Sequence, residues 1–254
     1  MTVFVFTKKM MFIYAAAALA AIMIFAAGKG AYTAITASST PKELPIYCVD
    51  TDKKEIALTF DAAWEDTDTD EIIETLKKND AKASFFMVGG FIKRFPDSVK
   101  KFADNGHEIL NHSDSHAHMA SLNEEQIKEE LDGCEKKISD TVGSSKKLFR
   151  PPYGEYNDNV IKYAKKAGYT AIQWDVDSLD WKDLSADEIY RRVVGKTENG
   201  SIILFHNGAK NTPEALKTVL PALKKQGFKF VTVSELIYKK DYTIDNSGKQ
   251  KILK

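Results

Sequence analysis

Residues 55–64, EIALTFDAAW, decide the fold class of this chain. Residues 56–60 form a short apolar run that is typical of a buried strand, and Asp61 follows the run directly. Six further runs of this kind lie at 83–88, 108–111, 147–150, 170–174, 201–205 and 229–233. Stretches with helical spacing separate them, and this alternation predicts a single α/β domain around a parallel sheet. Periodicity does not distinguish a closed barrel from an open sheet.

The stretches between the predicted strands repeat apolar residues every three or four positions, as helices packed on a sheet do. Two such faces are Ile127, Leu131, Cys134 and Ile138, and Leu216, Val219, Leu220 and Leu223. Ser185 and Glu188 match a capping box, and Thr212 followed by Pro213 is typical of a helix start. The first face assigns Cys134 to the core. The sequence allows a disulfide between Cys48 and Cys134 outside the cell but gives no support for it.

The composition excludes several classes of protein. The chain has 254 residues, of which 43% are hydrophobic and 28% charged, so it is neither disordered nor fibrous. Equal numbers of basic and acidic residues, 36 of each, argue against a nucleic-acid binder. Two cysteines exclude a disulfide scaffold and a four-cysteine zinc site.

The N-terminus carries a predicted membrane span. Residues 10–27, MMFIYAAAALAAIMIFAA, contain no charge, and a helix of this length measures about 27 Å, enough to cross a hydrocarbon core. Lys8 and Lys9 precede it, which places the N-terminus in the cytoplasm and the remainder outside. The length favours an uncleaved signal anchor over a cleaved signal peptide, for which the small residues at 31–37 would supply a site.

The sequence therefore predicts four segments. Residues 1–28 are the cytoplasmic tip and anchor, 29–52 a linker, 53–238 the functional domain and 239–254 a basic C-terminal tail. Four lysines and one glutamate in residues 1–44, and five lysines and two aspartates in 239–254, leave 27 basic and 33 acidic residues between them. The net charge of zero is therefore the sum of two basic terminal segments and an acidic segment between them.

Ionisable residues gather at the ends of the predicted strands, where parallel α/β folds build their sites. Five of the seven strand ends carry them. The residues are Asp61, His112 with His116, Arg150, then Asp175, Asp177 and Asp180 with Trp181, and His206. Each alone is typical of a cap or a turn, but together they predict one active site.

Four of the five histidines lie within residues 107–118, and this cluster is the strongest single signal. His112 and His116 are four residues apart, which on a helical turn places both imidazoles on one side as a metal pair. His107 is interpreted as structural. His118 is interpreted as a further metal ligand, as a residue that hydrogen-bonds to a ligand, or as an exposed residue.

The segments TFDAAW, HSDSH, RPPYG, DVDSLDW and LFH, in this order and at these spacings, resemble the five motifs of the NodB-homology polysaccharide deacetylases, carbohydrate esterase family 4. The resemblance covers about residues 53–237. It implies a distorted (β/α) barrel with about seven strands. With the N-terminal anchor, the chain is most similar to the sporulation-associated, membrane-anchored deacetylases of Gram-positive bacteria.

The resemblance implies metal-dependent removal of N-acetyl groups from a peptidoglycan or chitin-like glycan. A divalent metal, Zn²⁺ or Co²⁺, would be held by His112 and His116. Asp61 would be the general base, paired with Arg150, and His206 the general acid. Asp180 would be the partner of His206, with Asp177 as the second candidate for this role. The Tyr153 N–H would donate to the oxyanion, and Trp181 would form a wall of the acetyl pocket.

The chain departs from the family pattern at Ala62, where the family commonly has an aspartate as its third metal ligand. Glu65, Asp66, Asp68 and Asp114 are candidates to replace it. Three readings therefore compete: an active deacetylase, a weakly active or inactive glycan-binding relative, and a glycoside hydrolase with Asp61 and Asp175 as its carboxylate pair. The last leaves the histidine pair and Arg150 unexplained.

Overall fold

The computed structural model describes residues 43–143 and 145–253, and its centre is an open parallel sheet. The strand order along the sheet is β6-β5-β4-β3-β2-β8-β7, and β9 pairs with the first residues of β2 on the side opposite β8. The strands are β2 (Glu55–Ala62), β3 (Ala83–Met87), β4 (Glu108–Asn111), β5 (Leu148–Phe149), β6 (Thr170–Ala171), β7 (Val176–Asp177), β8 (Ile202–His206) and β9 (Lys229–Val231). All their pairings are parallel. The α/β class is confirmed, and the seven-stranded path is a half-barrel rather than a closed barrel.

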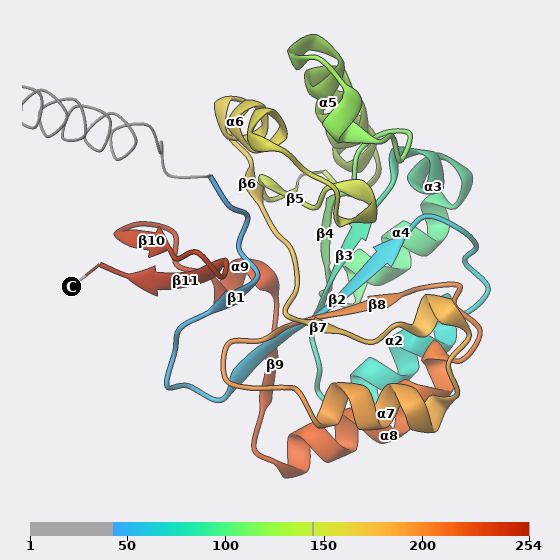
Figure 1. The fold of residues 1–254 in the computed structure, drawn as a ribbon. Coiled ribbons are helices and arrows are strands. Elements are labelled where there is room, and N and C mark those ends of the chain that lie inside the picture. The colour runs from blue at the N-terminus through green and yellow to red at the C-terminus, as the bar shows by residue number, and fades with distance from the viewer. Residues whose placement is uncertain (1–42, 144, 254) are drawn as a thin grey trace, which may run out of the picture. The chain divides into compact units, whose positions relative to one another are not determined.

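Helices surround the outer side of the strands (Figure 1). They are α2 (Thr69–Lys78), α3 (Gly89–Arg94), α4 (Pro96–Asp104), α5 (Glu124–Val142), α6 (Asp158–Lys166), α7 (Ala186–Val194) and α8 (Thr212–Lys225). The short helix α9 (Val233–Leu236) packs on the other face of the strands, against Ala57, Phe86 and Leu110. Both predicted apolar faces, on α5 and α8, are fully buried. The capping box of Ser185 and Glu188 begins α7, and Pro213 lies in the first turn of α8, as predicted.

The predicted strand at 170–174 forms a sheet strand only at residues 170–171, and a separate strand, β7, follows at 176–177. β6 lies at one edge of the sheet and β7 at the other, so the chain crosses between the edges after Ala171. In the crossing, the N–H of Gln173 donates to the carbonyl of Ile46 instead of a sheet neighbour. An apolar run does not reveal this change of partner, which is why the sequence predicted a strand that continues to residue 174 and missed β7.

The expected C-terminal tail is a strand pair. β10 (Tyr242–Ile244) runs antiparallel to β11 (Lys249–Ile252), and β11 pairs with β1 (Cys48–Val49), which lies inside the expected linker. Asp245 closes the turn by accepting hydrogen bonds from the N–H groups of Ser247 and Lys249. β10 is only three residues long and β11 is rich in lysine, so neither gave the apolar pattern that identified the other strands.

The two cysteines are not bonded to each other. Cys48 and Cys134 are both free thiols, and the Cys134 thiol donates to the carbonyl of Met87 at 3.2 Å. The structure therefore excludes the disulfide that the sequence left open.

Within residues 43–143 and 145–253, no helix combines the length and the apolar character that crossing a bilayer requires. The predicted span, residues 10–27, lies outside the described range, and so does most of the predicted linker.

Candidate active site

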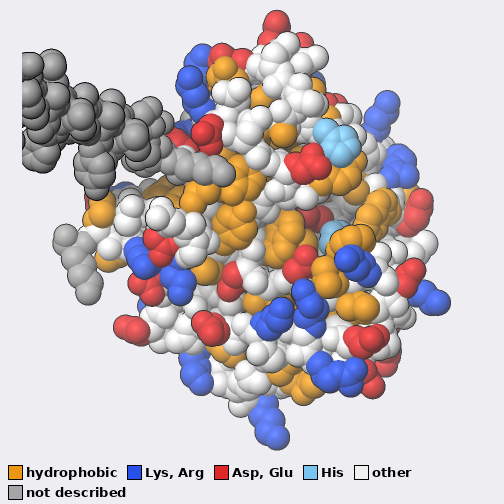
Figure 2. Space-filling model, in the orientation of Figure 1, with side chains coloured by type: hydrophobic (Ala, Val, Ile, Leu, Met, Phe, Trp, Pro, Cys, Tyr) orange, Lys and Arg blue, Asp and Glu red, His pale blue; other side chains and the backbone are white. Residues whose placement is uncertain are grey.

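The carboxyl ends of the central strands bring the predicted residues together. Asp61 lies opposite His206 in the pairing of β2 with β8. His112 directly follows β4, and Arg150 directly follows β5. Figure 2 shows histidine side chains on this face of the molecule with acidic and hydrophobic side chains beside them. The convergence inferred from the strand ends is therefore present.

Asp61 forms a buried ion pair with Arg150. The guanidinium Nη1 donates to Asp61 Oδ1 at 2.7 Å, and Nη2 donates to the carbonyl of Gln173 at 3.0 Å. Arg150 is fully buried, with its guanidinium over the rings of Phe86 and Trp174. Burial raises the pKa of the Asp61 carboxyl, but the charge and hydrogen bond of Arg150, together with the charges of His112 and His206, outweigh burial and hold this pKa below its usual range. Asp61 is thus ionised and can accept a proton.

The histidine pair lies next to this carboxylate. His112 Nδ1 is 2.8 Å from the carbonyl of Arg150, so Nδ1 carries the proton and Nε2 presents its lone pair. Nε2 lies 3.5 Å from Asp61 Oδ2. Burial lowers the pKa of His112 to about 4, so the ring is neutral at neutral pH. The His116 ring centroid is 5.1 Å from that of His112.

The pair does not lie on a helical turn, as the spacing had suggested. Residues 112–118 form a loop, in which Ser113 has φ 65° and His116 has φ 62°. Two residues in the left-handed region reverse the chain, and this reversal brings the rings together. A four-residue spacing has the same appearance in a helix and in such a loop.

A third protein ligand is absent from the part of the chain that the structure describes. No group of three or more His, Cys, Asp or Glu side chains there could hold a metal ion. Asp66 accepts a hydrogen bond from Ser98, Asp68 accepts one from the N–H of Gly208, Asp114 pairs with Lys137, and Glu65 lies 3.9 Å from Arg94. The two imidazoles fit two positions of a divalent-metal site, and none of the four candidates completes it.

His206 forms the second buried pair, with Asp180. His206 Nδ1 lies 2.7 Å from Asp180 Oδ1, and Oδ2 accepts hydrogen bonds from the His206 N–H and the Thr212 hydroxyl. Burial lowers the pKa of His206, but the hydrogen bond and charge of Asp180 raise it more, so the net direction is upward. Asp177, the reserve candidate, instead accepts a hydrogen bond from the N–H of Leu179.

Three exposed aromatic side chains surround these pairs. Trp64, Tyr153 and Trp181 are 45%, 56% and 50% exposed. The Tyr153 ring contacts His116, with centroids 4.4 Å apart, and its backbone has φ 60°. Trp64 stacks on His206, with centroids 5.3 Å apart. Sequence reasoning gave Trp64 no role, although its position three residues after Asp61 was a usable signal.

His118 joins the rim rather than the histidine pair. Its ring stacks on Tyr153 with centroids 4.3 Å apart, and its Nδ1 is 2.8 Å from Glu155 Oε2. His107 is buried against Phe85 and Phe102 at the start of β4, as its structural interpretation predicts.

Asp175 lies away from the site. It accepts hydrogen bonds from the Ser201 hydroxyl and the Ile202 N–H at the amino end of β8, whereas His206 is at the carboxyl end. Burial raises the pKa of Asp175 to about 6. The glycoside hydrolase reading is therefore wrong, because Asp61 and Asp175 do not face one another across a sugar.

Residues 49–172 match the family model described as polysaccharide deacetylase. A peptidoglycan-N-acetylglucosamine deacetylase of Bacillus cereus is 37% identical over 188 residues, covering 72% of this chain and 68% of the relative. The peptidoglycan-N-acetylmuramic acid deacetylase PdaA of Bacillus subtilis is 33% identical over 199 residues, covering 77% of this chain and 76% of the relative.

Among solved structures, wild-type BA3943 of Bacillus anthracis, described as a CE4 family pseudoenzyme, superposes with a TM-score of 0.74 at 35% identity. The match covers 80% of this chain and 71% of that one. A mutant of BA3943 described as having restored enzymatic activity matches with a TM-score of 0.73, also at 35% identity, over 80% of this chain and 73% of that one.

Proposed function

Because the chain belongs to the polysaccharide deacetylase family, we propose that it hydrolyses the N-acetyl amide of a peptidoglycan-like amino sugar. One observation carries this proposal. The surroundings shift the pKa values of two groups in opposite directions: the pKa of Asp61 is lowered and the pKa of His206 is raised. A base and an acid that coexist at neutral pH are what amide hydrolysis needs.

Each residue has a defined task in this reaction. Asp61 takes a proton from the water whose oxygen attacks the acetyl carbonyl carbon, and Arg150 keeps Asp61 ionised until that transfer. The N–H of Tyr153 donates to the carbonyl oxygen as charge develops there. When the C–N bond breaks, His206 gives its proton to the departing nitrogen, and acetate and a free amino sugar result. Asp180 orients the imidazole and favours its protonated form.

Metal chemistry would enter through the histidine pair. A divalent ion such as Zn²⁺ or Co²⁺, held by His112 and His116, would polarise the carbonyl and lower the pKa of the water. His112 suits this task because its Nε2 is unprotonated and its Nδ1 is fixed by the carbonyl of Arg150.

A second function is favoured by Ala62. Catalytic zinc sites normally have three protein ligands, and this site offers two imidazoles. A weakly active or inactive relative that binds glycan is the alternative that follows. The similarity to a protein described as a pseudoenzyme supports keeping it as the second candidate.

One assay separates the two functions. Chain purified from about Ser38 onward is incubated with N-acetylglucosamine oligomers and with peptidoglycan, with and without added Zn²⁺ or Co²⁺, and acetate release is measured. We expect metal-stimulated release that is lost in Asp61→Asn and His206→Ala. Retained glycan binding with no acetate under any metal condition favours the second function.

The sequence also supports a location for this activity. We propose that residues 10–27 anchor the protein in the cytoplasmic membrane with the catalytic domain outside, where peptidoglycan or a spore-wall glycan is accessible.

A further inference from the structure

The loop from His112 to His116 contains backbone torsion angles that are unfavourable for residues other than glycine. Ser113 and His116 both have positive φ, and residues with a Cβ are strained in this region. Such strain persists only where surrounding contacts impose it. Within the loop, the Ser113 N–H donates to Asn111 Oδ1 and the His116 N–H donates to the Ser113 hydroxyl oxygen. Asp114 and Ser115, between the two strained residues, make the contacts that tie the loop to the helices beside it.

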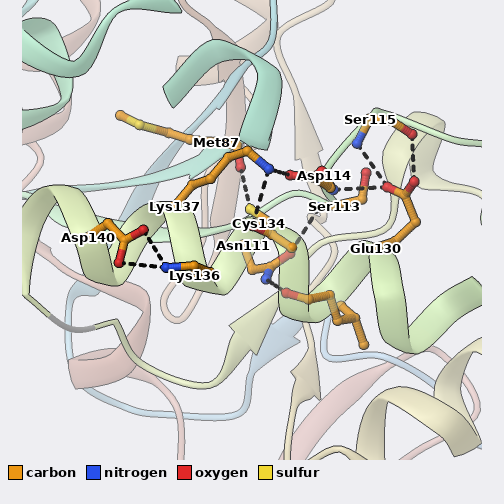
Figure 3. A network of polar contacts seen from close by, with 12 residues as sticks. Met87, Asn111, Ser113, Asp114, Ser115, Glu130, Cys134, Lys136, Lys137 and Asp140 are labelled. Carbon is orange, nitrogen blue, oxygen red and sulfur yellow. Dashed lines mark hydrogen bonds and ion pairs between the residues drawn. The ribbon is translucent and has the colours of Figure 1, made fainter. Parts of the chain in front are cut away.

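Most of these contacts come from one side chain of α5, Glu130 (Figure 3). Glu130 Oε2 accepts hydrogen bonds from the N–H groups of Asp114, at 2.9 Å, and Ser115, at 2.8 Å. Oε1 accepts one from the Ser115 hydroxyl at 2.6 Å. Hydrogen bonds from N–H to an ionised carboxylate are stronger than those between neutral groups, so Glu130 fixes the middle of the loop from outside.

The Asp114 carboxylate is held by residues of α3 and α5. Asp114 Oδ1 lies 2.5 Å from the Lys137 ammonium, about two turns after Glu130 along α5. The carboxylate occupies a slot between two glycines: a Cβ at Gly89 would lie 1.9 Å from Oδ1, and one at Gly133 would lie 3.0 Å from Cγ. Lys137 and the slot together hold Asp114 away from the role of third ligand.

Backbone contacts from α3 complete the support. The N–H of Gly89 donates to the carbonyl of Ser113 at 3.0 Å, and the N–H of Gly90 donates to the carbonyl of Asp114 at 3.0 Å. The loop is therefore held on one side by a helix N-terminus, through its carbonyls, and on the other by Glu130, through its N–H groups. Glu130 is the only side chain in this arrangement that binds two consecutive N–H groups of the loop within the described residues.

We propose that Glu130 is a positioning residue for the histidine pair: its carboxylate imposes the strained loop that places His116 beside His112. The inference rests on the proposed function in one respect, that the pair binds a divalent ion. Glu130 does not contribute to the apolar face of α5, which is formed by Ile127, Leu131, Cys134 and Ile138. Its removal therefore acts on the loop rather than on the packing of the helix.

The test uses the full-length chain in detergent and two measurements that need no turnover. The first is the affinity for Zn²⁺ and Co²⁺ by calorimetry, and the second is amide hydrogen exchange of Asp114 and Ser115. We expect Glu130→Ala to weaken metal binding by about 10- to 100-fold, as loss of a residue that orients metal ligands commonly does. We also expect faster exchange at both amides. Glu130→Gln, which keeps one acceptor oxygen at the same place, should be intermediate.

The matched control is Lys136→Ala on the same helix. Lys136 is exposed and bonds Asp140 one turn away, with no contact to the loop. It should leave both measurements unchanged. Wild-type affinity and exchange in Glu130→Ala would overturn the proposal. If the wild-type chain binds no metal, the proposed function fails, while exchange at Asp114 and Ser115 still decides whether Glu130 imposes the loop.

Discussion

At the scale of single residues, the site depends on two buried pairs, Asp61 with Arg150 and His206 with Asp180. In each pair, burial and neighbouring charges shift the pKa of the titrating group in opposite directions. Burial alone would neutralise Asp61 and deprotonate His206, since it disfavours the charged form of any group. Arg150, with the charges of His112 and His206, reverses the effect on the Asp61 pKa, and Asp180, with the charges of Asp61 and Asp177, reverses the effect on the His206 pKa. The proposed base and the proposed acid each have one fully buried main partner, Arg150 and Asp180, and removal of these partners is therefore informative.

Replacing Asp180 by Asn should move the pH dependence of the enzyme. Without the carboxylate, burial dominates, and the pKa of His206 falls below 6.5 instead of lying above it. The alkaline limb of the kcat/KM profile should shift to lower pH, with activity reduced about 10²–10⁴-fold near neutrality because the general acid is lost. The profile and the NMR titration of the His206 ring measure the shift. An unchanged imidazole titration would contradict the assigned pairing.

The same pair predicts a direction for stability. Because the folded-state pKa of His206 is raised above its unfolded value, the pair contributes its full stabilisation below about pH 6.5 and loses it as pH rises through the folded pKa. The free energy of unfolding should therefore fall on the alkaline side in the wild type. In Asp180→Asn this alkaline decrease should be missing.

Ala62→Asp tests whether the missing carboxylate limits the metal site. If two imidazoles bind weakly because a third ligand is absent, the affinity for Zn²⁺ should rise in this variant, as calorimetry would show. Ala62 is fully buried in an apolar cluster with Phe60 and Met87, so the variant should also lose about 1–3 kcal/mol of stability. Ala62→Asn, similar in size but uncharged, is the control. A folded Ala62→Asp chain with unchanged affinity would show that another group already fills the position.

At the scale of elements, the C-terminal strand pair is held by one buried polar side chain. Gln250 in β11 is fully buried; its Oε1 accepts from the Tyr238 N–H and its Nε2 donates to the Tyr238 carbonyl, both at 2.8 Å. Gln250→Ala leaves both main-chain groups unpaired, so we expect a loss of about 2–4 kcal/mol. Thermal unfolding measures it, with Thr243→Ala on exposed β10 as the control. Equal melting temperatures would mean that residues 239–254 behave as the tail that their sequence suggested.

The elements that the sequence predicted correctly share one physical property: they bury a periodic apolar face. The strand at 108–111 and the faces of α5 and α8 belong to this class. β10 and β11 bury little besides Gln250, and β7 follows a crossing that depends on a contact with Ile46, more than 100 residues earlier in the chain. Patterns along a sequence report what one element buries, and they do not report its distant partners.

The same distinction applies to the site. Asp61, Arg150, His112 and His206 were predictable because strand ends in a parallel sheet meet at one edge. The choice of Asp180 over Asp177 depends on side-chain direction after a turn, and Leu179 between them has a left-handed backbone that spacing does not reveal. Likewise, the exclusion of Asp175 follows from its position at the opposite end of the strands.

At the scale of the whole molecule, the distribution of charge separates the body of the protein from its ends. Residues 45–238 carry 27 basic and 33 acidic side chains, while both termini are basic. The structure adds that the basic C-terminal segment is paired with β1, close in sequence to the N-terminal segment. The basic C-terminal segment is therefore part of the folded domain, and its strand β11 pairs with a strand inside the predicted linker, residues 29–52.

This arrangement leads to a prediction about the intact chain. If residues 10–27 are an uncleaved anchor, the full-length protein should sediment with membranes, resist extraction by high salt and be released by detergent. Leu19→Lys combined with Ile22→Lys should shift it out of the membrane fraction, because each lysine at the centre of a span costs about 2.5–3.5 kcal/mol. Ala16→Leu, which adds apolar surface, is the control and should remain membrane-bound. If Lys8 and Lys9 orient the domain outward, protease added to intact protoplasts should digest it. A soluble mature chain beginning within residues 31–37 would instead identify the segment as a cleaved signal peptide, and the deacetylase would then reach its glycan by secretion.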